Sequence, residues 1–304
     1  GPMPYSHAAD ATMNIPFDSE KEVYTAMFEE LTAAIEELTE KAENGVNVMG
    51  AYDAVYAGDA TKWVKYGNSL MLRLAMRVRF DDAELAKKYA TQAVNHSIGV
   101  MTAKDDAAQM SQGAGMTFRN NIEWLAGNYN EARMGSSIFS YLMGYEDPRL
   151  NVYFLPMDGN ASYGVEAFDG KTYQAVPAGH ANAQNDIYKS CSKPNIQSGT
   201  PTYWLRASEV YFLRAEAALV WEGFGSADSW YKQGIDMSFQ ENGVTDPVDD
   251  YMNSNLSPRA YVLSHYQYGQ TLSAPCETTV KFEGTTEQKL EKIMIQKWIA
   301  LFPN

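Results

Sequence analysis

The sequence is poor in the residues that build metal and nucleophile sites. It has two cysteines and four histidines among 304 residues. Cys191 and Cys276 show neither a CxxC spacing nor companion histidines, and no histidine pair has the helical spacing of a zinc motif. There is also no GxSxG elbow and no calcium-loop spacing of carboxylates. We therefore expect no metal, no cofactor and no catalytic residues, while the two thiols fit either one disulfide or two separate buried cysteines.

Positive charge and long apolar runs are also scarce. The chain has 24 lysines and arginines against 38 aspartates and glutamates, so its net charge is −14. An acidic protein repels nucleic-acid phosphates and anionic lipid headgroups, so we expect no nucleic-acid partner. No apolar run is long enough to cross a bilayer. The composition favours neutral or weakly charged ligands.

Aromatic residues are plentiful, with 20 tyrosines and six tryptophans. Their large, stiff rings with a polar tip suit the recognition of sugars and peptides. The alternative is that most of them fill a helical core, which the 45% hydrophobic content would support. We expect more than half of them to have that structural role.

Helix signals are clear in the first hundred residues. Ser19 with Glu22 forms a capping box, and apolar spacings of three and four then predict a helix to residue 44. A second helix opens at Asp59, and a third runs from Asp82 to about residue 96. The residues of the second helix predicted to point inward are Trp63, Tyr66, Leu70, Leu74 and Val78. The basic residues of its other face, interpreted as solvated, are Lys62, Lys65, Arg73 and Arg77.

A similar layout returns later in the chain. Residues 203–221 predict a long helix, followed by a glycine break and a partner helix over 226–239. Residues 79–100 align without a gap on 223–244, and this helix–turn–helix layout is typical of tetratricopeptide-like repeats. A last helix is predicted from about residue 285 to 301. The residues expected on its inward side are Leu290, Met294, Trp298 and Leu301.

These helices form a frame that carries two irregular regions. The frame is expected to comprise residues 19–98, 203–240 and 285–302, and the irregular regions are 101–200 and 246–284. Long irregular connections in a compact domain usually carry function. We therefore expect an all-α fold in one domain over residues 1–304, with recognition assigned to the loops.

Five loop aromatics are the candidate ligand-binding residues. They are Trp124, Tyr129, Tyr153, Tyr163 and Tyr188. Amide and cationic groups lie in the same stretch, and an aromatic face with nearby polar groups is a usual way to hold a sugar ring. The alternative is that these rings pin the loops to the frame. A glycoside hydrolase would need two facing carboxylates, and the many acidic loop residues show no such arrangement in sequence.

Several long motifs resemble those of the SusD/RagB family. Residues 62–77 (KWVKYGNSLMLRLAMR), 206–217 (RASEVYFLRAEA) and 295–304 (IQKWIALFPN) are similar to its helical segments. Residues 147–150 (DPRL) and 1–5 (GPMPY) match its turns. The motifs are in the family's order and extend over nearly the whole chain.

The resemblance implies a surface lipoprotein of the outer membrane with a SusD-like, all-α, tetratricopeptide-like fold. It also implies that the protein captures glycans, or peptides in some members, and passes them to a SusC-like TonB-dependent transporter. Such a protein is not an enzyme and meets the membrane only through a lipid anchor, which we expect to lie outside this chain. We expect the chain to be a fragment without the family's two ends. The matching motifs belong to the frame, so the resemblance assigns no ligand residue.

Overall fold

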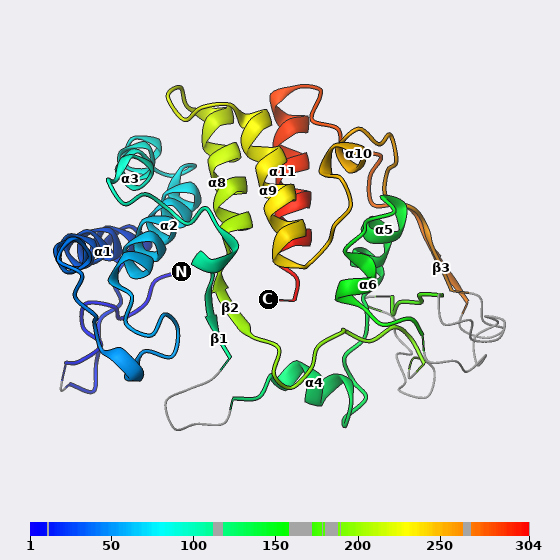
Figure 1. The fold of residues 1–304 in the computed structure, drawn as a ribbon, viewed down its shortest axis with the longest axis horizontal. Helices are drawn as coiled ribbons and strands as arrows, with labels where there is room; N and C mark the ends of the chain where they lie inside the picture. The colour runs from blue at the N-terminus through cyan, green and yellow to red at the C-terminus, as the bar shows by residue number, and fades with distance from the viewer. Residues whose placement is uncertain are drawn as a thin grey trace.

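The computed structural model describes residues 1–10, 12–111, 118–157, 172–177, 179, 188, 190–263 and 269–303. Within them the chain is mostly helical, as Figure 1 shows. The longer helices are α1 (Glu20–Glu43), α2 (Ala60–Val78), α3 (Ala83–Asn95), α8 (Ala207–Val220), α9 (Ala227–Glu241) and α11 (Thr286–Ala300). The shorter ones are η1 (Gly50–Tyr52), η2 (Lys104–Asp106), α4 (Asn121–Ala126), α5 (Ser136–Gly144), α6 (Leu150–Tyr153) and α10 (Val248–Met252). The predicted all-α class is confirmed.

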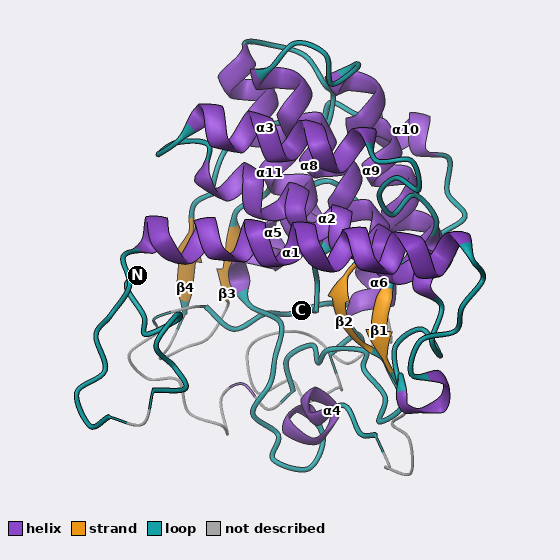
Figure 2. Cartoon of the chain, turned by 90° about the vertical axis from the view of Figure 1, so that its left-hand side faces the viewer, coloured by secondary structure: helices purple, strands orange, loops and turns teal. Residues whose placement is uncertain are grey.

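Two small antiparallel sheets lie between the helices and the loops. Strand β1 (Ala108–Met110) pairs with β2 (Thr202–Leu205), and β3 (Tyr261–Leu263) pairs with β4 (Gln270–Leu272). The longer helices gather at one end of the molecule, and α4 lies beyond the β1–β2 pair at the other end, as Figures 1 and 2 both show. None of the described helices combines the length and the apolar character needed to cross a membrane.

The predicted starts of the first three long helices are confirmed by their caps. Ser19 and Glu22 form the capping box of α1, and Asp59 and Asp82 accept hydrogen bonds at the starts of α2 and α3. These signals were readable because a cap depends on residues only two or three positions apart.

The prediction of a helix from Tyr203 is wrong over its first residues. Residues 202–205 form strand β2, and the helix begins only at Ala207, after Arg206 in an extended conformation. Leu205 pairs with Ala108 and Tyr203 with Gln109. Pairing with a strand nearly a hundred residues away therefore overrides the local composition.

The predicted inward face of α2 packs against the core at Trp63, Tyr66, Leu74 and Val78, but the most deeply buried residues of α2 and α11 lie beside the predicted stripes. Trp63, Leu70 and Leu74 are only half-buried, whereas the deeply buried residues of α2 are offset by about one position, with Val64 and Met71 fully buried. The same offset occurs in α11. There Leu290, Met294 and Leu301 are half-buried and Trp298 is exposed, and the core residues are Ile293, Ile295 and Ile299. Helix α2 packs mainly on α1 and α3 and also contacts α8, whereas α11 packs on α8 and α9. The buried stripes follow these neighbours.

The basic residues of α2 are not simply a solvated face. Lys65 pairs with the buried Asp106 at 2.9 Å, and Arg73 pairs with Glu209 of α8 at 2.6 Å. Arg77 is exposed, as predicted. The interpretation is therefore wrong for Lys65 and Arg73, because their partners lie more than 40 positions away and no local pattern reveals them.

The pairing of α8 with α9 relies on small residues at the seam. Ala215 and Ala217 are fully buried on α8. Gly234 of α9 lies so close to the Phe212 ring that a Cβ at this position would stand 2.8 Å from it. Small side chains let the two helices approach closely enough for the aromatic ring to fill the space between them.

A buried ion pair anchors the turn after α5. The Arg149 guanidinium donates to the Asp147 carboxylate at 2.6 Å, and both side chains are fully buried. Arg149 also donates to Ser238 on α9 and Gln296 on α11, and Tyr251 donates its hydroxyl proton to Asp147. The residues 147–150 thus join three helices through one satisfied polar network.

Arg149→Met is expected to lower the free energy of unfolding by about 3–5 kcal/mol, because it leaves the Asp147 carboxylate buried and unpaired. Urea denaturation measures this loss. The matched control is Arg77→Met at the exposed arginine of α2, with an expected change below about 0.5 kcal/mol. Equal losses in the two variants would contradict a structural role for the buried pair.

Candidate functional site

Helix α4 carries the exposed aromatic surface of the loop region, and Asn120 fixes its position. The Asn120 side chain accepts a hydrogen bond from the Ile122 amide at 3.0 Å and so caps the helix. Its own amide groups donate to the carbonyl oxygens of Ser198 at 2.8 Å and Thr200 at 3.1 Å. The short helix is therefore fastened to the segment that leads into β2.

Trp124 and Tyr129 form an aromatic pair on this surface. Trp124 is 37% exposed and Tyr129 is 58% exposed, with ring centroids 6.0 Å apart and planes at 64°. The Arg119 guanidinium lies 4.2 Å from the Trp124 ring centroid and pairs with Glu123 at 2.7 Å. Two solvent-facing rings beside a cation and a carboxylate offer both stacking and hydrogen bonding to a ligand.

A tight turn after α4 places Tyr129 beside Trp124. The amides of Asn128 and Tyr129 both donate to the Trp124 carbonyl oxygen, at 3.0 and 3.2 Å. Asn130 has a φ of +58°, in the left-handed region that asparagine tolerates better than most residues. Its side chain accepts a hydrogen bond from Arg133. The geometry of the pair is thus set by the backbone of the turn as well as by ring contact.

The other candidate tyrosines lie elsewhere. Tyr153 is 3% exposed, packs on Phe302 with ring centroids 4.9 Å apart, and accepts a hydrogen bond from Asn242. Tyr188 is 5% exposed and belongs to the same hydrophobic cluster. Tyr163 lies outside the described residues. The described surface therefore brings together Trp124 and Tyr129, whereas Tyr153 and Tyr188 fill the core, as the alternative interpretation held.

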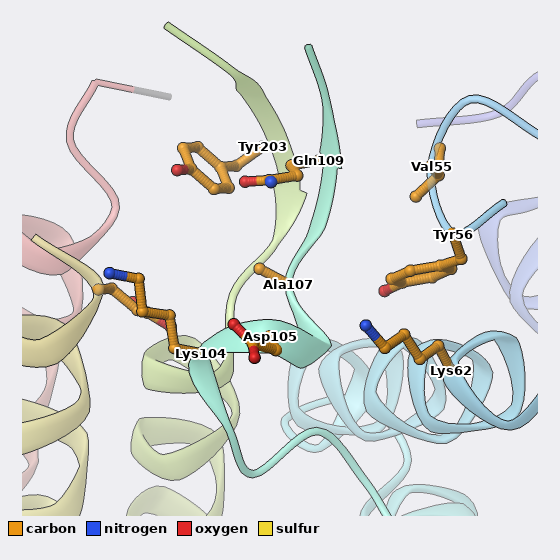
Figure 3. A pocket seen from close by; sticks show the side chains of 9 residues that line it. Val55, Tyr56, Lys62, Lys104, Asp105, Ala107, Gln109 and Tyr203 are labelled. Atoms are coloured by element: carbon orange, nitrogen blue, oxygen red, sulfur yellow. The ribbon is translucent and has the colours of Figure 1, made fainter. Parts of the chain in front are cut away.

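A separate cavity of about 280 Å³ lies beside β1 and β2, and Figure 3 shows its lining. Its walls come from the turn before α2, from α2 itself, from η2 and β1, from β2 and from the end of α9. The polar and aromatic lining residues are Tyr56, Lys62, Lys104, Asp105, Gln109, Tyr203 and Glu241. The sequence did not reveal this cavity, because Lys62 and Tyr203 are predicted to lie in the helical frame. No spacing in the chain links residues 55–62, 104–109, 203 and 241.

Asp106 holds the wall of this cavity in place. Its carboxylate accepts hydrogen bonds from Lys65 at 2.9 Å and from the amides of Thr102 and Ala103, while its carbonyl oxygen accepts the Tyr56 hydroxyl at 2.7 Å. Burial pushes the pKa of Asp106 upward, but these hydrogen bonds outweigh it and hold the pKa below its ordinary value. The ionised carboxylate therefore stabilises the fold.

Because the pKa of Asp106 is lower in the folded protein than in the unfolded chain, its ionised carboxylate stabilises the fold. This stabilisation is complete above the unfolded-state pKa of about 3.9 and is lost as the pH falls through the folded-state pKa. Lys65→Met is thus expected to be less stable than the parent at pH 7. We expect that difference to shrink below about pH 4. Urea denaturation across this range measures it, with Lys87→Met on the exposed face of α3 as the control. A difference that stays constant with pH would argue against the Lys65–Asp106 contact.

Among the residues that the structure describes, no three histidine, cysteine or carboxylate side chains converge as metal ligands. The helical pairs and the small loop strands define an all-α scaffold, and comparison with known proteins identifies its family. The family model described as "Susd and RagB outer membrane lipoprotein" matches residues 1–304. The chain belongs to this SusD-like family.

Solved structures of SusD homologues share the whole fold. A SusD-like protein from Bacteroides thetaiotaomicron has a TM-score of 0.90 at 33% identity, and a SusD homologue from Bacteroides vulgatus has 0.87 at 33%. A chitin-binding SusD homologue from Flavobacterium johnsoniae has 0.88 at 34%. Each match covers 100% of this chain and 61–62% of the other chain, so this chain is similar to about three fifths of each relative. No curated protein matches.

Proposed function

We propose that this chain is part of a cell-surface glycan-binding protein that captures oligosaccharides and passes them to a SusC-like TonB-dependent transporter. In this proposal the full-length protein is anchored by a lipid on the extracellular face of the outer membrane. Membership of a family of outer membrane lipoproteins supports this location. The chitin-binding relative at 34% identity favours a glycan over a peptide.

The observation that carries the ligand proposal is the exposed aromatic pair on α4. Trp124 lies at the surface with the Tyr129 ring centroid 6.0 Å from its own, so two solvent-facing rings stand side by side. An aromatic face packs on the C–H face of a pyranose, while Arg119 and the exposed Asn128 can bond its hydroxyls. Shape and stacking of this kind select neutral sugar rings without any covalent chemistry.

Trp124→Ala is expected to weaken glycan binding at least tenfold, because a stacking residue at the centre of a site contributes about 2 kcal/mol. Isothermal titration calorimetry with a panel of oligosaccharides that includes chito-oligosaccharides measures the change. The thermal midpoint should move little, since the ring is substantially exposed.

The matched control is Phe80→Ala, which removes another exposed aromatic ring, two residues after the end of α2 and outside the α4 surface. It should leave glycan affinity unchanged. Lost stability with unchanged affinity in Trp124→Ala would assign Trp124 to packing and move the site to residues 246–284. Binding of peptides but not of glycans by the parent would instead favour a peptide-binding role.

The protein is proposed to bind glycans without cleaving them. Overnight incubation with the same oligosaccharides, followed by chromatography and an assay for new reducing ends, should leave them intact. The physical reason is that stacking and hydrogen bonding provide no acid–nucleophile pair of the kind hydrolysis needs. Turnover that a single aspartate or glutamate substitution abolishes would establish the hydrolase alternative.

A further inference from the structure

The cavity beside β1 and β2 has an aromatic wall that is held in a fixed position. Tyr203 lines the cavity, and the Arg206 guanidinium lies 3.6 Å from its ring centroid. Arg206 is 4% exposed, so it acts as a rigid support behind the ring. Gln109, which pairs with Tyr203 across the two strands, adds an amide next to the ring, as Figure 3 shows. A flat ring beside an amide is suited to a sugar ring.

Two lysines, Lys62 and Lys104, line this cavity together with two acidic residues, in a protein whose net charge is −14. Within the described residues Lys62 forms no ion pair, and Lys104 donates only to the Gln240 carbonyl oxygen at 3.2 Å. Figure 3 shows the two lysines on opposite sides of Ala107, with Lys62 rising from α2 beside Tyr56. A lysine without a carboxylate partner at a cavity wall is available to an anionic ligand.

Arg206 adds a third positive charge behind the wall. Its Nε and Nη1 atoms are buried and have no hydrogen-bond partner in the described part of the chain. A buried guanidinium with unsatisfied donors is costly. The nearby Glu241 shares no hydrogen bond with it and instead accepts from the Ser208 hydroxyl at 2.6 Å and the Ser208 amide at 3.1 Å. The positive potential of Arg206 is therefore only partly compensated.

The acidic side chains of the lining limit what kind of anion can bind. Asp105 forms no ion pair within the described residues and lines the cavity together with Glu241. A polyanion would be repelled by these two carboxylates. A ligand with one negative charge and several hydroxyl groups matches the lining better, since Asp105 and Gln109 can bond hydroxyls while a lysine holds the charge.

We propose that this cavity binds a uronic acid residue of a glycan, with Lys62 holding the sugar carboxylate and Tyr203 packing on the ring. The inference rests on the proposed glycan-binding function but places an acidic sugar at a second site, apart from the Trp124–Tyr129 pair. The volume of about 280 Å³ is at the lower end for a small-ligand pocket and suits about one sugar ring. Lys104 supplies further positive potential and a donor for hydroxyl groups.

The test compares each acid with its own ester. The probes are the methyl glycosides of glucuronate, galacturonate and mannuronate, together with their methyl esters, titrated by isothermal calorimetry at low salt. At least one acid should bind about fivefold or more tightly than its ester, because only the acid makes the lysine ion pair. Raising sodium chloride from about 0.05 M to about 0.5 M should weaken binding of the acid and not of the ester.

Lys62→Gln should remove the preference for the acid, whereas Lys62→Arg and the exposed control Lys87→Gln should keep it. The preference should also survive Trp124→Ala, because that ring belongs to the other site. Equal binding of acid and ester, or no binding of any of the three acids, would overturn the proposal. Loss of the preference in Trp124→Ala would do the same by placing the acid at α4. If the uronic acid test fails, the proposed glycan-binding function is still tested separately by Trp124→Ala with neutral oligosaccharides.

Discussion

Helix α8 belongs to both hydrophobic clusters of the molecule, with Val210 and Leu213 in one and Phe212 and Ala215 in the other. It also carries two buried carboxylates, Glu209 and Glu216. An unpaired carboxylate at such a position would cost several kcal/mol. The helix can therefore be enclosed only where neighbouring helices bring cations to it.

Those cations come from both sides of α8. Arg73 and Arg79, in and at the end of α2, pair with Glu209 at 2.6 Å and Glu216 at 2.9 Å, and Lys297 of α11 reaches Glu216 at 3.5 Å. These ion pairs restrict how α2 and α11 can lie against α8. The ion pairs contribute specificity of packing more than net stability.

The two candidate ligand surfaces occupy a different part of the molecule from this enclosed helix. The aromatic pair on α4 and the cavity beside β1 and β2 both lie toward the end where the loops and small strands gather, as Figures 1 to 3 show. Lys65 of α2 holds Asp106 beside the cavity, whereas the carbonyl oxygens of Ser198 and Thr200 hold Asn120 at the start of α4. These contacts position the side chains that face solvent. A relative with the same frame can present other side chains at the exposed positions, such as Trp124 and Tyr129, because these do not belong to the hydrophobic clusters around α8.

The sequence by itself determined the starts of the first three long helices, the all-α class and the family, because caps such as Ser19 with Glu22 and motifs such as residues 62–77 depend on neighbours along the chain. It also indicated the α4 aromatics, which interrupt a stretch poor in helical period. Only the tertiary structure decided that Tyr153 is buried, that Tyr203 is in a strand, and that Lys62 faces a cavity. The physical reason is that burial and strand pairing depend on segments far apart in the chain, and side-chain type and spacing alone do not encode which of these segments meet.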